Sequence, residues 1–169
     1  APLAVGRTAG PAAPRGAQDP ARADSVVAAA SPLRRPFLAA FEGLGINVFV
    51  NRLDAWVRDA HDLDGVAWPR VNPRTWSRNL RLGWTWDTDA FVTNMFAHPY
   101  HGSMYFNAGR ANGLDFWESV PLAFLGSLSW EYFGETYQPS MNDLYNTGFG
   151  GIVLGEVYHR LVALLRDNG

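Results

Sequence analysis

Imidazole and carboxylate side chains recur in the second half of the chain at spacings that suit a helix. Three pairs carry this pattern: His98 and His101, Glu131 and Glu135, and Glu156 and His159. Residues three or four apart share one face of a helix, so each pair could present two ligands to the same point. Helical bundles assemble metal sites from such pairs, including the Glu-x-x-His pairs of di-iron proteins. A divalent metal bound by His98 and His101 is therefore one hypothesis.

The same side chains could also support hydrolysis. A histidine acts as a general base when a carboxylate orients it, which suits either histidine with either of the first two glutamates. However, the chain has only one Glu-x-x-His pair and no His-Glu-x-x-His, and no Gly-x-Ser-x-Gly surrounds Ser103. Because each catalytic signature is incomplete, we predict no catalytic residues. The alternative is a metal- or histidine-dependent hydrolase that uses His98, His101, Glu131 and Glu135.

A structural role is the interpretation that we favour for these residues. Buried ionisable groups need hydrogen-bonded or oppositely charged partners, and this region supplies both signs of charge. We predict a buried polar network that joins the helices, made of His98, His101, Arg110, Glu131, Glu135, Asp143 and Asn146. Asp143 and His159 are sixteen residues apart, which is about 160° around a straight helix. Asp143 should therefore cap its own helix or meet the histidines from another helix.

The hydrophobic pattern predicts helices throughout. Apolar residues recur at helical spacing after Phe37, which predicts an amphipathic helix over Pro36–Asp62. Its apolar stripe would face the core or a partner, and we favour the core. Asn72-Pro73 is typical of an N-cap followed by proline at the first helical position, with Gly83 closing a short helix. Further helices are expected at Ala90–Ala97, from Pro99 to about Asn112 with Gly113 as the stop, at Asp115–Phe133, and from Ser140 to about Asp167.

Prolines and glycines predict where these helices bend or approach one another. A break is expected at His98, because Pro99 disfavours helical geometry at the residue before it. Pro121 should kink or restart the helix over Asp115–Phe133. In the last helix Gly151-x-x-x-Gly155 would let a neighbouring backbone come close.

The segment Val66–Trp86 contains no acidic residue but is rich in arginine and tryptophan. Such a stripe suits the headgroup layer of a membrane or an acidic partner, although it could equally be a solvated arginine face over a tryptophan-lined core. The residues predicted to contact a partner or a membrane are Arg70, Arg74, Arg78, Arg81, Trp68, Trp76 and Trp84.

Composition limits the classes of protein to consider. The 169 residues are enough for one domain with a core, and the net charge of −2 argues against nucleic-acid binding. The absence of cysteine excludes disulfides and thiolate metal sites. No uninterrupted apolar run reaches ~20 residues, so no spanning helix is expected, whereas attachment to a membrane surface stays open.

The first 36 residues differ from the rest of the chain. They are rich in Ala, Pro, Gly and Arg and have few large apolar side chains, so burial would not offset their ordering entropy. We expect an extended arm over residues 1–36 that lies along a partner subunit, followed by a helical domain over residues 37–169.

A series of short motifs resembles a known bacterial family. They include Asp87-x-Asp-x-Phe91, His98-Pro-Tyr-His-Gly-Ser103, Trp130-Glu-Tyr132, Asn142-Asp143 and Gly155-Glu156. In their order and spacing, residues 86–160 resemble the family called domain of unknown function 3943. The resemblance implies an exported bacterial envelope protein in a periplasmic or outer-membrane-facing setting, and it implies no activity. A looser similarity, carried by Glu131, Asp143, Asn146 and Gly150, connects the chain with small helical membrane-associated proteins of the VanZ-like type.

These observations predict an all-α protein, a compact bundle of about five short helices with an extended, irregular N-terminal arm. The predicted function is a non-catalytic accessory or scaffold subunit on the periplasmic side of a bacterial membrane, exported and with its signal peptide removed. It would bind a larger membrane-associated assembly through the arm and the arginine–tryptophan segment. The expected partners are protein subunits and membrane lipids, not nucleic acid. No cofactor is predicted, and a bound divalent metal is the alternative.

Overall fold

The computed structural model describes residues 34–60 and 68–167. Most of the arm predicted over residues 1–36 lies outside these residues. The regular structure of the described residues is helical apart from an isolated parallel bridge between Thr85 and Ser140, which confirms the all-α prediction. The α-helices are α2 (Pro36–Ala60), α3 (Pro73–Asn79), α4 (His98–Ala111), α5 (Phe116–Ser129), α6 (Met141–Tyr145) and α7 (Gly151–Asp167).

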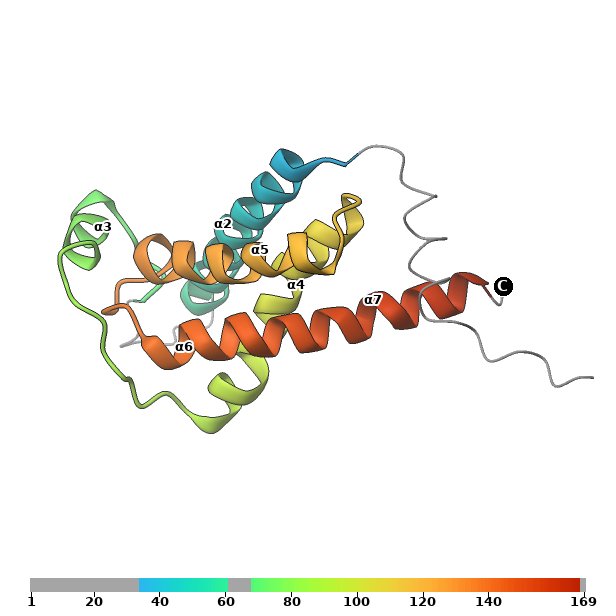
Figure 1. Cartoon of the computed structure of the whole chain (residues 1–169). Helices are drawn as coiled ribbons and strands as arrows, with labels where there is room; N and C mark the ends of the chain where they lie inside the picture. The colour runs from blue at the N-terminus through green and yellow to red at the C-terminus, as the bar shows by residue number, and fades with distance from the viewer. Residues whose placement is uncertain (1–33, 61–67, 168–169) are drawn as a thin grey trace, which may run out of the picture.

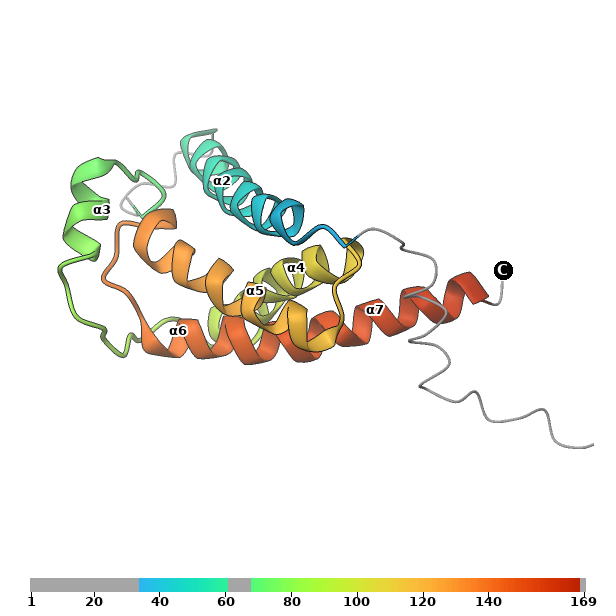
Figure 2. The same ribbon diagram turned by 45° about the horizontal axis from the view of Figure 1, so that its top comes forward.

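Three π-helical turns extend these helices: η1 (Thr93–Ala97) leads into α4, η2 (Trp130–Gly134) continues α5, and η3 (Asn146–Gly150) joins α6 to α7. Helix α4 lies in the middle of the bundle and packs against α2, α5 and α7 (Figures 1 and 2). The long rod of α6, η3 and α7 runs along one side, and in both views the end of α7 extends beyond its neighbours. The compact bundle predicted from the sequence is confirmed.

The predicted helix boundaries are largely confirmed. Asn72 caps α3 in a reciprocal capping box with Thr75, and Pro73 occupies the first helical position. The Ser140 side chain caps α6. Gly113 adopts φ 80°, a left-handed conformation that glycine adopts without strain, where the helix over α4 ends.

Two expected interruptions are absent. The backbone at His98 is right-handed helical (φ −63°, ψ −50°), so η1 runs into α4 without the predicted break. A wider π turn just before Pro99 relieves the crowding that a proline imposes on the preceding turn. Helix α5 likewise continues through the exposed Pro121 without restarting.

Close contact between α4 and α7 depends on two glycines. A Cβ on Gly102 would lie 1.8 Å from the Thr147 carbonyl oxygen, and a Cβ on Gly151 would lie 2.4 Å from the Gly102 carbonyl carbon. The two backbones therefore cross in direct contact, as the glycine spacing in the last helix predicted.

The favoured prediction for the apolar stripe of α2, that it faces the core, was wrong. This stripe faces away from the bundle: Phe37, Phe41 and Val48 are 81%, 70% and 64% exposed. The buried positions of α2 are small or polar and include Ala39, Asn47 and Asn51. Hydrophobic periodicity marks an amphipathic helix, but it cannot say whether the apolar side meets the protein interior.

Two asparagine amides hold α2 in this orientation. Asn47 donates to the Gly126 carbonyl (3.1 Å) and Asn51 to the Gly134 carbonyl (2.7 Å), so the polar side of α2 faces α5 and η2. The buried apolar core is correspondingly small and lies between α4, α5 and α7. It consists of Phe106, Ala123 and Ile152, with Phe116, Val120 and Phe124 packed against them.

The expectation that no helix could span a membrane also needs correction. The helices α6 and α7 and the turn between them form one uninterrupted helix, Met141–Asp167, whose best window has a mean hydropathy of 1.3. By length and composition this helix could cross a bilayer, and only 22% of that window is buried in the protein. Polar and charged residues such as Asn146, Glu156 and Arg160 interrupt its apolar runs in the sequence, so a search for an unbroken apolar run misses it.

Candidate functional site

Polar and ionisable side chains gather where α6 begins, between η1, η2 and the loop before η1. We call this group the Asp143 cluster; its members are Asp87, Asp89, Asn94, His98, Glu131, Glu135, Ser140, Asn142, Asp143 and Asn146. The three π turns border it, and such turns occur often at functional sites.

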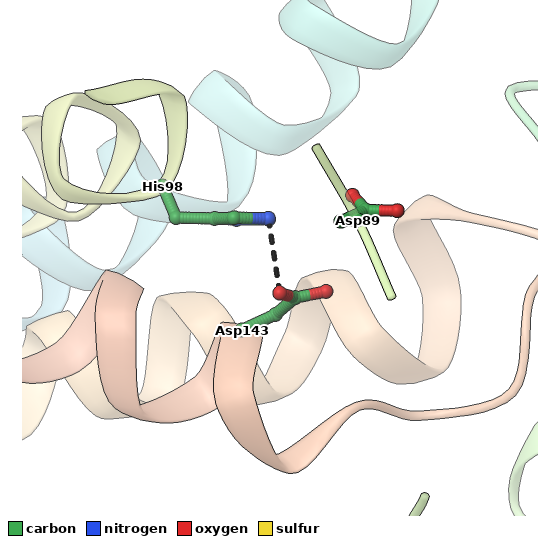
Figure 3. A group of neighbouring side chains, drawn as sticks. All are labelled: Asp89, His98 and Asp143. Carbon is green, nitrogen blue, oxygen red and sulfur yellow. Dashed lines mark ion pairs between the residues drawn. The ribbon is translucent and has the colours of Figure 1, made fainter. Parts of the chain in front are cut away.

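The centre of the cluster is the pair formed by His98 and Asp143. The His98 Nε2 atom lies 3.2 Å from Asp143 Oδ1, and both side chains are largely buried. The other ring nitrogen of His98 lies 3.2 Å from the Thr147 hydroxyl. Figure 3 shows the imidazole pointing at the Asp143 carboxylate, with the Asp89 carboxylate facing the same space from a separate segment. Asp143 thus meets the histidine region from another helix, as the sequence predicted.

Asparagine amides tie the surrounding segments together. Asn142 Nδ2 lies within hydrogen-bonding distance of Asp87 Oδ1 (2.6 Å) and Asp143 Oδ1 (3.1 Å). Asn146 Nδ2 donates to Asn94 Oδ1 (2.9 Å), which links η3 to η1. Amide groups therefore join the loop over residues 87–89, η1 and α6, and they hold two carboxylates close together.

Two glutamates approach Asp143 from η2 and the residue after it. The Glu131 carboxylate is buried and accepts a hydrogen bond from the Ser140 backbone N–H (2.8 Å). Burial, and then the neighbouring Glu135, raise the pKa of Glu131 to about 9. Burial, together with the charges of Asp143 and Asp89, raises the pKa of Glu135 to about 8. At neutral pH both glutamates are therefore mainly protonated unless a positive charge is present.

The aspartates of the loop before η1 differ from each other. Burial and the adjacent Asp87 raise the pKa of Asp89. Burial acts in the same direction on Asp87, but hydrogen bonds led by the Asn142 side chain outweigh it, and the net pKa of Asp87 is lowered. Asp87 therefore carries its charge at neutral pH, which adds to the unfavourable electrostatics of ionising the glutamates.

The cluster offers two compact sets of metal ligands. One oxygen or nitrogen atom each from Asp89, His98 and Asp143 lies within 4.8 Å of the others, and so do oxygens from Glu131, Glu135 and Asp143. Asp143 belongs to both sets. Helical proteins use shared carboxylates of this kind to bind one or two divalent cations.

The second histidine of the motif lies in a different environment. His101 Nε2 is 2.8 Å from the Tyr105 hydroxyl, which in turn donates to Asn47 of α2. The His101 ring also contacts Trp130, with ring centroids 4.9 Å apart. Burial, and to a lesser degree His98, lower the pKa of His101 to about 4, so it is neutral at physiological pH. Neither compact ligand set includes His101.

Arg110, also expected in the network, lies apart from the cluster. Its Nε atom is 3.4 Å from Glu156 Oε2, and Arg160 pairs with the other oxygen of the same glutamate at 2.8 Å. This pair connects α4 to α7 towards the other end of the rod. Of the seven residues predicted for one network, the structure brings together His98, Glu131, Glu135, Asp143 and Asn146.

The arginine–tryptophan segment divides into two sides. Trp68, Trp76 and Trp84 pack on the aromatic residues of η2, with ring centroids 5.6–5.9 Å from Trp130, Phe133 and Tyr132 respectively. The arginines at the remaining predicted contact positions are exposed; they are Arg70, Arg74, Arg78 and Arg81. The tryptophans thus hold α3 and the residues on either side of it against η2, while the four arginines are exposed.

Several members of the cluster were not predicted as site residues. Asp87 and Asp89 precede the helix expected over Ala90–Ala97, and Ser140 was expected to start the last helix. The available signal was the closely spaced pair of aspartates only nine residues before His98, in a segment poor in positive charge. Asn79 was also missed, although its buried amide donates to the carbonyls of Glu131 (3.3 Å) and Glu135 (3.0 Å) and thereby fixes η2.

Comparison with known proteins supports the resemblance seen in the sequence. The model of the family described as Domain of unknown function (DUF3943) matches residues 83–169, which include every member of the Asp143 cluster. No curated protein and no solved structure matches the chain significantly. Since the family model covers just over half of the chain, the protein belongs to the family Domain of unknown function (DUF3943).

Proposed function

We propose that this protein is a membrane-associated component of the bacterial envelope, on the periplasmic side, whose Asp143 cluster binds a divalent cation. The observation that carries this proposal is the charge of the cluster. Five carboxyl groups, from Asp87, Asp89, Glu131, Glu135 and Asp143, surround the single imidazole of His98.

A purely structural network would be expected to balance its charges. Buried carboxylates are normally paired with a cation, because ionising them in a low-dielectric environment is strongly unfavourable. Here burial, and then the charges of the other carboxylates, raise the pKa values of Glu131 and Glu135 and so disfavour their ionised forms. A divalent cation at Asp143 would neutralise this excess and allow the glutamates to ionise.

The ligand types restrict the kind of cation. Four carboxylates and an imidazole suit Mn²⁺, Fe²⁺ or Zn²⁺, since imidazole is a poor ligand for Ca²⁺ and Mg²⁺. Such a cation polarises a bound oxygen and lowers the pKa of a bound water, the chemistry of metal-assisted hydrolysis. The protein would contribute Asp143 as the shared ligand, with Asn142 holding that carboxylate in place.

A cation titration tests the proposal. The full chain in detergent, treated with chelator and then dialysed, should bind Mn²⁺ saturably at pH 7.5, as measured by electron paramagnetic resonance of free Mn²⁺. Asp143→Asn, which keeps the size of the side chain but removes the shared charge, should weaken binding at least tenfold. Asp167→Asn, at the exposed end of α7, is the matched control and should bind as the wild type does.

The outcome that contradicts the proposal is equally clear. Wild-type protein that shows only weak, non-saturable binding, or an Asp143→Asn variant that binds as tightly as the wild type, would exclude the cluster as the cation site. Circular dichroism of each variant establishes that the helices are intact, so that lost binding is not confused with lost structure.

A non-catalytic accessory subunit is the second candidate function. The observation in its favour is that hydrogen bonds among Asn94, Asn142 and Asn146 already connect η1, α6 and η3. The cluster would then serve the fold, and the exposed basic surface of α3 would contact an acidic partner or lipid phosphates. Under this candidate, Asp143→Asn lowers the free energy of unfolding while the protein binds no cation.

A further inference from the structure

We propose that the acyl chains of a lipid bilayer cover the outer faces of α2 and of the Met141–Asp167 helix, and that this helix crosses the bilayer. The proposed function needs only attachment to a membrane, so this inference goes beyond it. It depends on the outer faces of the helices and does not depend on the Asp143 cluster.

The distribution of polarity is the first argument. The fully or nearly buried side chains include many polar ones, such as Asn79, Ser119, Ser127 and Glu131, each at most 1% exposed. Few large apolar side chains are buried, Phe106 and Ile152 among them, and most of those in the described residues are exposed. Proteins in water show the opposite arrangement, because burial of apolar surface drives their folding. In a bilayer there is no gain from burying apolar groups, and polar groups are turned inward.

The spread of the apolar surface identifies lipid as its occupant. At least half-exposed apolar side chains occur on α2, η1, α5, η3 and α7; examples are Phe41, Phe96, Leu125, Phe149 and Val153. A protein partner or a second copy of the chain would cover one side of the bundle. Lipid surrounds a protein, so it accounts for apolar residues on several separate elements at once.

The charged side chains within the spanning helix turn towards the bundle, and the exposed ones lie towards its end. At its start, the bridge between Thr85 and Ser140 joins the segment that follows α3 to the residue before Met141. At the other end, the first exposed charge is Arg160. The 27 residues of the helix cover about 40 Å at 1.5 Å per residue, which exceeds the hydrocarbon thickness of a bilayer, about 30 Å. Within the helix Asp143 meets His98, and Glu156 pairs with Arg110 of α4.

The packing of the helices agrees with this environment. Helices α4 and α7 meet through Gly102 and Gly151, whose backbones are in direct contact. Small residues at a helix crossing are typical of membrane proteins, where close van der Waals packing replaces the hydrophobic effect as the source of association.

Single-cysteine spin labelling tests the proposal directly, because the chain has no cysteine to remove. The full chain is reconstituted in vesicles of phosphatidylcholine and phosphatidylglycerol, and labels are placed at four exposed apolar positions. Val153→Cys and Val48→Cys lie on the proposed lipid faces and are 68% and 64% exposed in the wild type. Leu80→Cys and Leu165→Cys, at 57% and 75%, are matched controls that lie next to the exposed Arg81 and Arg166.

The expected result is a contrast in collision rates. Labels at Val153 and Val48 should collide several-fold more often with oxygen, which concentrates in acyl chains, than with a water-soluble nickel complex. Labels at Leu80 and Leu165 should show the reverse preference.

Two other results would overturn the proposal. Preferential collision with nickel at all four positions would mean that the outer faces meet water, and low rates with both reagents at Val153 would mean that protein covers them. Binding of Mn²⁺ by the same samples is measured in parallel, so failure of the lipid inference and failure of the cation site are distinguishable.

Discussion

At the scale of single residues, Glu131 and Glu135 make the stability of the protein depend on pH. Their folded pKa values of about 9 and about 8 lie above the usual value of 4.5. At pH values between 4.5 and these folded pKa values, the two glutamates are still protonated in the folded protein but have lost their protons in the unfolded chain. Stability is therefore lost as pH rises from 4.5 through the folded pKa values. His101 has the opposite effect, but only between its folded pKa of about 4 and the usual 6.5.

We predict that cation-free protein becomes less stable between pH 7 and pH 9, where His101 no longer contributes. The slope should approach about 1.4 kcal/mol per pH unit for each carboxyl that stays protonated in the folded state. Glu131→Gln keeps an oxygen for the Ser140 N–H and should flatten the slope. Thermal unfolding across this range checks the prediction. Equal slopes for the wild type and Glu131→Gln would contradict it, and Asp167→Asn should match the wild type.

A second prediction concerns Asn79, which is fully buried. Asn79→Ala leaves the carbonyls of Glu131 and Glu135 without their amide donor and should lower the free energy of unfolding by about 2–4 kcal/mol. Asn72→Ala, an exposed helix cap seven residues away, should lower it by only about 1 kcal/mol. Denaturant titrations of the two variants measure the difference, and similar losses would mean that Asn79 does not support η2.

At this scale the sequence identified most of the ionisable residues but could not assign their partners. The motif containing His98 and His101 suggested one site, whereas in the structure the first ring meets Asp143 and the second meets Tyr105. The reason is geometric: two residues three apart on a helix differ by about 60° in direction, which is enough for the neighbouring helices to separate them. Asp89 was missed because an aspartate before a helix is most simply explained as a cap.

At the scale of helices, the crossing of α4 and α7 leaves no room for a side chain. Gly151→Ala should lower the free energy of unfolding by about 3 kcal/mol or more, because its Cβ would meet backbone atoms that cannot move aside. Gly45→Ala is the matched control. It lies in α2 with nothing within 4 Å of a Cβ, and it should raise stability by up to about 1 kcal/mol through helix propensity. Thermal unfolding of both variants in detergent checks these signs, and a stabilised Gly151→Ala would contradict the crossing.

Helix positions were predictable because their signals are local. Asn72, Ser140 and Gly113 mark helix ends through hydrogen bonds and backbone geometry within a few residues. The orientation of α2 was not predictable in the same way. Its apolar stripe is real, but the direction it faces depends on Asn47 and Asn51 finding carbonyl acceptors about 80 residues further along the chain.

At the scale of the whole molecule, the many exposed apolar side chains should make the protein depend on detergent in solution. Val157→Ser with Leu161→Ser replaces two exposed side chains on the outer face of α7 that are 48% and 50% exposed. Because no packed interior is disturbed, the double variant should keep its helical content and remain monodisperse at lower detergent concentration than the wild type. Size-exclusion chromatography and circular dichroism check this, and loss of helical content would show that these residues pack inside the protein.

The sequence predicted the all-α class of the protein, but it did not predict which helix faces are exposed. Composition and periodicity indicated helices, whereas the predicted core on α2 assumed that apolar residues turn away from water. That assumption holds only when the solvent is water. The absence of a long apolar run also hid the Met141–Asp167 helix, in which polar residues such as Glu156 and His159 separate the apolar ones.

The three π turns suggest how such a site could arise in a simple helical bundle. A π turn accommodates one residue more than an α-helical turn, and each of η1, η2 and η3 borders the Asp143 cluster. Removing one residue from such a turn would restore a regular helix and rotate everything beyond it by about 100°. His98 would then turn away from Asp143. The extra residue in each π turn thus sets the direction in which the polar side chains beyond it point.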